Sequence, residues 1–143
     1  MRDKTLVILV LVATLLFAAH NADHIARGDL RWPLTVESFP FLLVLLLVFS
    51  MIGGGLYLYQ RNKVGPRFWA IFGAVSIALG WFGHFSPFTD QPPQYIFNAY
   101  RSATAGWLAV GTLVALMLSL IATTIYAGML WVRRASTTDV NSK

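Results

Sequence analysis

The stretch from Thr5 to His24, TLVILVLVATLLFAAHNADH, decides the fold of this chain. It is apolar as far as Ala19 and then ends in a polar turn that contains two histidines and an aspartate. An α-helix rises about 1.5 Å per residue, so about 20 mainly apolar residues are needed to cross the roughly 30 Å hydrocarbon core of a bilayer. The segment has this length and composition. It therefore predicts a transmembrane helix.

Three further segments have the same length and apolar character. The four predicted spans cover residues 5–24, 38–59, 67–85 and 103–132. Pro40 and Pro66 lie near the starts of the second and third spans, where a missing N–H costs nothing, and Pro87 follows the end of the third. The chain is 57% hydrophobic and only 12% charged, whereas soluble domains are about half apolar and about a quarter charged. We therefore expect an all-α integral membrane four-helix bundle over residues 1–134, followed by a disordered cytoplasmic tail at 135–143.

The basic residues are distributed unevenly between the two sides that four crossings create. One side holds both termini and the 60–66 loop, with Arg2, Lys4, Arg61, Lys63, Arg67, Arg133, Arg134 and Lys143. The other side holds Arg27, Arg31 and Arg101. The positive-inside rule then places both termini in the cytoplasm and predicts a multi-pass protein of the cell membrane. Because these charges flank apolar runs and form no clustered basic face, we expect a lipid bilayer and no nucleic acid as partner.

Metal-ligand residue types collect at the outer ends of the predicted spans. The candidate ligands are His20, Asp23, His24, Glu37, His84 and Asp90. Residues three or four apart share a helix face, so His20, Asp23 and His24 are expected to point the same way. Two imidazoles and a carboxylate suit Zn, Fe, Cu or Mn, and the other candidates would complete the set. In the simpler alternative the helix merely leaves the membrane here, and Asp23 pairs with Arg27.

A second candidate site lies on the third span. Gly73, Ser76 and Gly80 fall on or near the helix face that ends at His84, and such small residues allow another helix or a flat ligand to approach closely. His84 would then bind haem b, with His20 as the second axial ligand, or donate to a quinone or a lipid headgroup. The alternative is that these small residues serve helix packing alone. The chain has no cysteine, which excludes disulfides and thiolate metal sites.

The leading functional hypothesis is a transition-metal site at the outer membrane face, used in redox chemistry or in metal handling. No ionisable residue falls in the middle of a predicted span, and no hydrolase signature is present, so the sequence leaves open whether the protein is an enzyme. The alternatives are an accessory or assembly subunit of a larger membrane complex, and a haem-, quinone- or lipid-binding protein. Besides lipid, the candidate partners are a larger membrane complex or further copies of this chain in a homo-oligomer. The metal hypothesis requires that the first and third helices be neighbours at their outer ends.

Overall fold

The computed structural model describes residues 3–30, 34 and 36–140, without the side chains of residues 37 and 137–140. The described residues form five α-helices and one 3₁₀ turn, and they contain no strand. The elements are α1 (Lys4–Arg27), η1 (Val36–Ser38), α2 (Phe39–Gln60), α3 (Pro66–His84), α4 (Pro93–Asn98) and α5 (Ala103–Val140). The predicted all-α class is confirmed.

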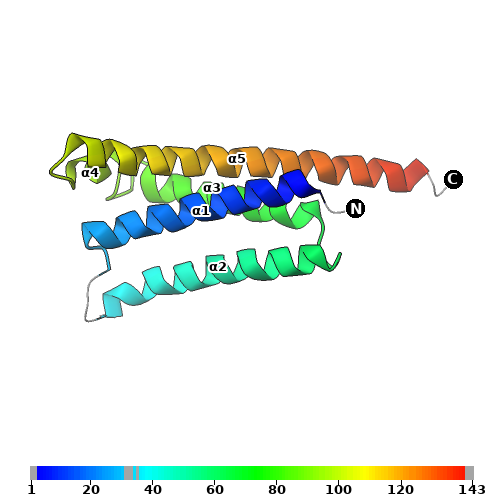
Figure 1. The fold of residues 1–143 in the computed structure, drawn as a ribbon, viewed down its shortest axis with the longest axis horizontal. Coiled ribbons are helices and arrows are strands. Elements are labelled where there is room, and N and C mark those ends of the chain that lie inside the picture. The colour runs from blue at the N-terminus through cyan, green and yellow to red at the C-terminus, as the bar shows by residue number, and fades with distance from the viewer. Residues whose placement is uncertain (1–2, 31–33, 35, 141–143) are drawn as a thin grey trace.

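The long helices run up and down along one common direction (Figure 1). The start of α1, the turn between α2 and α3, and the last turns of α5 lie towards one end of the molecule. The end of α1, the start of α2, the end of α3 and the short helix α4 lie at the other end. The ends of α1 and α3 are therefore at the same level, as the metal hypothesis requires.

Three helices among the described residues are long and apolar enough to cross a membrane, namely α1, α2 and the Ala103–Ser136 part of α5. These helices indicate a membrane protein. The third predicted span is helical over almost its expected range, but α3 is not one of these three helices. A fourth crossing and the cytoplasmic location of the termini therefore stay predictions.

The last helix is longer than predicted. α5 has 38 residues, a length of about 57 Å, so it extends well beyond a hydrocarbon core of about 30 Å. Where the sequence predicts a disordered tail from Ala135, the helix continues to Val140. Each added residue extends an existing hydrogen-bonded helix without new nucleation, which explains this continuation. Residues 141–143 of the predicted tail lie outside the described part.

The small residues of α3 are packing sites for α5. A Cβ added to Gly73 would overlap the hydroxyl oxygen of Thr124, and one added to Gly80 would lie 2.7 Å from the sulfur of Met117. A side chain at either position would force the side chain of Thr124 or Met117 to move. The two glycines thus allow α5 to approach α3 closely, as the packing alternative expects, and both also line a cavity between the helices.

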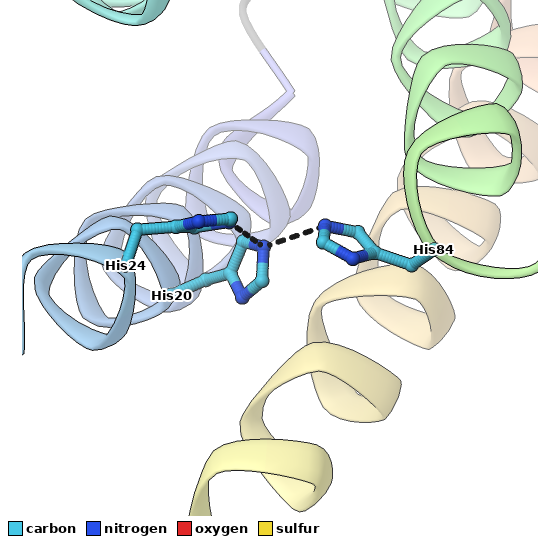
Figure 2. Close-up of side chains that lie close together, drawn as sticks. All are labelled: His20, His24 and His84. Atoms are coloured by element: carbon cyan, nitrogen blue, oxygen red, sulfur yellow. Dashed lines mark hydrogen bonds between the residues drawn. The ribbon is translucent and has the colours of Figure 1, made fainter. Parts of the chain in front are cut away.

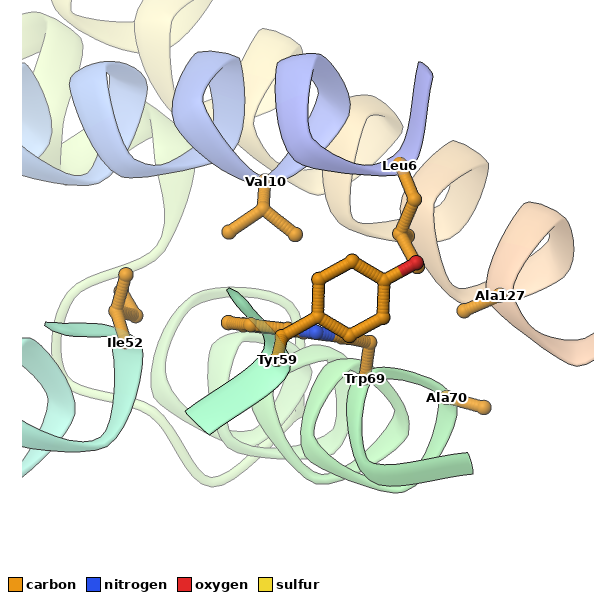
Figure 3. Packing of buried hydrophobic residues seen from close by; sticks show 7 residues of the cluster. All are labelled: Leu6, Val10, Ile52, Tyr59, Trp69, Ala70 and Ala127. Atoms are coloured by element: carbon orange, nitrogen blue, oxygen red, sulfur yellow. The ribbon is translucent and has the colours of Figure 1, made fainter. Parts of the chain in front are cut away.

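The main apolar cluster lies nearer the end that carries the start of α1 (Figure 3). It joins residues from all four long helices: Leu6, Val10, Ile52, Tyr59, Trp69, Ala70 and Ala127. The side chain of Asp3 caps α1 by accepting from the Leu6 N–H at 2.9 Å, and it also accepts from the hydroxyl of Tyr126 at 3.1 Å. The Asp3 N–H donates to the hydroxyl of Tyr59 at 3.2 Å. Asp3 thereby links α1, α2 and α5 at this end.

α2 is held to the other helices mainly through its C-terminal half. Its buried residues are Ile52, Gly55 and Tyr59, and none of the residues from Phe39 to Met51 is buried. A Cβ added to Gly55 would lie 2.5 Å from the Phe68 ring, so this glycine allows α3 to approach. Towards the histidine end, α2 has much weaker contact with the rest of the protein.

Candidate metal centre

Three histidines meet where α1 and α3 end (Figure 2). The Nε2 atom of His20 lies 3.1 Å from Nε2 of His84 and 3.1 Å from Nε2 of His24. One ligand nitrogen from each ring lies within 4.8 Å of the other two. His20 and His84 are buried and His24 is half-buried. The structure thus brings together the three histidines that the sequence proposes as ligands.

His24 is oriented by the turn that ends α1. Gly28 adopts a left-handed conformation with φ of 90°, and the Asp29 N–H donates to the carbonyl of His24 at 3.0 Å. This is the hydrogen-bond pattern with which a glycine terminates a helix and reverses the chain. The reversal carries the Asp29 carboxylate back to the helix, where its Oδ2 lies 2.8 Å from Nδ1 of His24.

His84 is oriented by the loop that follows α3. The Ser86 hydroxyl donates to the carbonyl of Phe82 at 2.9 Å, and the Gln91 N–H donates to the hydroxyl of Thr89 at 3.0 Å. These bonds fold the loop over the helix end. They place the backbone carbonyl of Gln91 3.1 Å from Nδ1 of His84.

The partners of Nδ1 indicate the tautomers of His24 and His84. The carbonyl oxygen beside Nδ1 of His84 can only accept, so this nitrogen carries the proton and donates it. Nδ1 of His24 lies 2.8 Å from the Asp29 carboxylate, which can only accept, and 3.1 Å from Nη2 of Arg27, which can only donate. We assign the proton to this nitrogen because the contact with the carboxylate is the shorter one. In the neutral imidazole the Nε2 atom then has a free lone pair, and in both rings this atom faces His20. The Nε2 of His20 can donate one proton to only one of these two acceptors. At least one lone pair in the cluster therefore has no protein proton to bind.

A metal ion satisfies all three nitrogens at once. Zn–N bonds of about 2.0–2.1 Å in a tetrahedral site give nitrogen separations of about 3.3 Å, close to the two separations of 3.1 Å seen here. Both helices end at this point, and the partial negative charge of helix C-termini favours a cation. A metal-bound histidine usually donates its second nitrogen to a carboxylate or a carbonyl, as His24 and His84 do. Three histidine ligands leave one coordination position open.

Asp23 belongs to a neighbouring polar network rather than to the nitrogen cluster. Its Oδ2 accepts from Nε of Arg27 at 2.9 Å, and its Oδ1 accepts from the hydroxyl of Tyr100. Burial and the bond to Asp23 raise the pKa of Tyr100 to about 12, so the phenol stays neutral and continues to donate. Arg27 also reaches Asp29 at 3.3 Å and the side-chain oxygen of Gln91 at 3.3 Å. This network holds the α1 turn and the outer loop together around the histidines.

The structure separates Asp23 and Asp90 from the cluster. Asp90 is exposed and contributes no ligand atom to the three-histidine group. The side chain of Glu37 lies outside the described residues. Asp23 pairs with Arg27, as expected in the alternative in which the helix merely leaves the membrane here. Of the six residues proposed as metal ligands, only the three histidines come together in the described part of the chain.

Haem fits this geometry poorly. A haem with two histidine ligands needs its flat macrocycle between the two Nε2 atoms. His20 and His84 have these atoms only 3.1 Å apart, and the ring of His24 occupies the adjacent space. A single small ion matches the arrangement of the imidazoles much better.

Sequence reasoning missed the two groups that orient the histidines. Asp29 follows a glycine five residues after His24, and a Gly helix-end signal could have suggested that it folds back. The Gln91 contact is made by a backbone carbonyl, which carries no side-chain signature. Searches against protein-family models, curated proteins and solved structures find no match to this chain.

Proposed function

We propose that this chain is a membrane metalloprotein that binds one transition-metal ion through Nε2 of His20, His24 and His84. The observation that carries the proposal is the convergence of the three nitrogens, at 3.1 Å for two of the pairs. In two of the rings the opposite nitrogen is engaged by an acceptor, which directs the lone pair inward. The bilayer supplies the surroundings, since three helices are long and apolar enough to cross it.

The same cluster without an ion is energetically unfavourable. Buried polar atoms without a partner each cost about 1–3 kcal/mol. The lone pairs of His24 and His84 compete for a single proton on His20, and Nδ1 of His20 is itself buried without a hydrogen-bond partner among the described residues. An ion removes the competition because it accepts three lone pairs at once. This gain is the reason to favour metal binding over a purely structural role for the histidines.

Ligand chemistry narrows the choice of metal. Imidazole nitrogen suits zinc, copper and iron, whereas manganese prefers carboxylate and water oxygens. No carboxylate of the described residues joins the three nitrogens, so zinc, copper and iron are better candidates than manganese. With one position open, such an ion can polarise an oxygen of a bound molecule or bind an exchangeable water. Both metal handling and catalysis need this open position.

We place the histidine end at the outer face of the cell membrane. The opposite end carries most of the basic residues, including Lys4, Arg61 and Lys63. An excess of basic residues is typical of the cytoplasmic side. This orientation and four crossings, with α3 as the third span, together form the topology of the proposal.

Metal analysis of the purified full-length protein tests the proposal. After loading with zinc and removal of weakly bound ions, we expect about one ion per chain by mass spectrometry of the elements. His84→Ala should abolish this binding. Asp90→Ala is the matched control, because Asp90 lies in the loop after α3 but outside the cluster, and it should leave the ion content unchanged. A wild-type protein that retains no ion would refute the proposal.

An accessory or assembly subunit is the alternative from another class. In that role the protein co-purifies with a larger membrane complex, and substitution of the histidines is tolerated. The paired orientation of His24 by Asp29 and of His84 by Gln91 favours the metal proposal, because helix packing alone does not require it. Complex assembly with the His84→Ala variant distinguishes the two.

A further inference from the structure

An apolar cavity of about 250 Å³ begins at the three histidines and extends between α1, α2, α3 and α5. Along α3 its lining runs from His84 to Trp69. Fifteen residues of helix correspond to about 22 Å, or most of the thickness of a hydrocarbon core. A cavity with this small volume and this length is narrow, and we call it the slot. Such a slot suits an extended chain better than a compact or planar group.

Apart from the histidines and the indole of Trp69, whose buried N–H has no partner among the described residues, the walls of the slot offer few polar groups to a ligand. The cavity is lined mainly by aliphatic and aromatic side chains such as Val10, Ile52 and Leu113. The hydroxyls of Thr14, Ser76 and Thr123, which also line it, each donate to a carbonyl of their own helix. An apolar chain therefore matches the lower part of the cavity.

A ligand with an oxygen atom would suit the histidine end of the slot. When Nε2 of His20 binds an ion, its Nδ1 must carry the proton, and this buried nitrogen has no acceptor among the described residues. His20 also lines the cavity. The proposed ion has an open position at the same end. A molecule with an oxygen-bearing head group would supply a ligand for the ion and an acceptor for this N–H.

The slot communicates with the side of the protein that faces lipid. Phe41, Val44 and Val48 of α2 line it, and none of these residues is buried. The wall formed by the N-terminal half of α2 is thus incomplete. Because the surroundings of the spanning helices are acyl chains, a cavity open on this side exchanges its contents with the bilayer and not with water.

We propose that this cavity binds a single-chain amphiphile, such as a fatty acid, with its chain between the helices and its oxygen-bearing head at the histidines. The inference rests on the proposed function for the position of the head, and on the cavity alone for the position of the chain. It assigns a substrate or ligand class to the metal site. The molecule enters laterally from the bilayer, past the N-terminal half of α2.

Photo-crosslinking of the full-length, zinc-loaded protein in lipid nanodiscs tests this inference. The probe is palmitic acid that carries a diazirine in mid-chain, and the labelled residues are identified by peptide mass spectrometry. We expect adducts on cavity-lining residues such as Val48 and Met117. Ala13→Leu on α1 and Ser76→Leu on α3 each narrow the slot and should each reduce these adducts at least fivefold.

Ala18→Leu is the matched control, since it makes the same substitution on an exposed part of α1. It should change neither labelling nor metal content. The inference is overturned if adducts appear only on exposed residues such as Leu15 and Leu46, with equal yield in every variant. A variant that fails to fold is recognised by loss of its ion, and the other filling variant then decides.

Metal content measured on the same samples separates the two proposals. Bound zinc without labelling of the cavity overturns the chain site and leaves the proposed function intact. Labelling without bound zinc overturns the proposed function and supports the chain site alone. In the cobalt-loaded protein, the visible spectrum should change when palmitic acid is added to the wild type and not when it is added to Ala13→Leu. An unchanged wild-type spectrum refutes the placement of the head group at the ion.

Discussion

Asp29→Asn gives the sharpest test of how the histidines are held. The substitution keeps the size of the side chain and removes the negative charge 2.8 Å from Nδ1 of His24. An asparagine oxygen can still accept a hydrogen bond, but its amide can equally turn its nitrogen to the ring and lose the preferred tautomer. The Nε2 lone pair of His24 then no longer points reliably at the ion. We therefore expect weaker metal binding without loss of the fold.

The expected loss of zinc affinity follows from the contact between Asp29 and His24, which is one of the proposed metal ligands. Substitution of a residue that orients a metal-bound histidine typically weakens metal affinity about 10–100-fold, or about 1.4–2.7 kcal/mol. Asp29 is only partly exposed, with 22% of its side chain accessible, so solvent screens its charge incompletely. Arg27 keeps its partner Asp23 in the variant, which preserves the local structure.

Competition with a chelator of known zinc affinity measures this change in the detergent-solubilised protein. Asp90→Asn is the control, because it removes a carboxylate from the same end of the molecule without touching the cluster. Its zinc affinity should stay within about twofold of the wild type. Equal affinities for Asp29→Asn and the wild type would refute the assigned tautomer of His24. Equal losses in both variants would mean that only the overall charge of this face matters.

Three further predictions concern pH and the two polar networks. Zinc affinity in a chelator assay should fall as the pH is lowered, because a protonated Nε2 has no lone pair for the ion; an affinity independent of pH would contradict histidine ligation. Asp3→Ala removes the α1 cap and the acceptor of Tyr126 and should cost about 1–2 kcal/mol in denaturant unfolding, whereas Lys4→Ala should cost less than about 0.5 kcal/mol. Tyr100 has a pKa raised to about 12, so its contribution to stability is complete below about pH 10 and is lost as the pH rises towards 12. The tyrosinate absorbance of the wild type should therefore show a component that titrates near pH 12, and Tyr100→Phe should lack this component. A wild type without it would contradict the contact with Asp23.

The helices could be predicted from the sequence because lipid imposes a length on apolar segments. The bounds of α1, α2 and α3 each agree with the predicted spans to within a few residues. Because successive helices alternate in direction, α1 and α3 run the same way and end at the same level, which is why His84 meets the histidines of α1. The end of α5 could not be predicted in this way, since beyond the membrane neither apolar length nor a capping signal marks where it stops.

Helix periodicity predicts which side chains of α1 share a face, and this was the only part of the site that the sequence could predict. With about 100° per residue, His24 lies about 40° from His20 around α1, while Asp23 lies about 60° away on the other side. This difference turns Asp23 towards Arg27 and Tyr100 and away from the nitrogen cluster. The contributions of Asp29 and Gln91 depend on how two loops fold back, and loop geometry of this kind follows from tertiary contacts that no local pattern encodes.

The uneven attachment of α2 has a mechanical consequence. Near its C-terminus the helix is anchored by the Tyr59 hydroxyl on Asp3 and by the close approach of Gly55 to Phe68. Nearer its N-terminus no buried residue restrains it. We therefore expect the N-terminal half of α2 to move more than its C-terminal half, which Gly55 and Tyr59 hold in place. Such movement would change the width of the cavity beside the imidazoles.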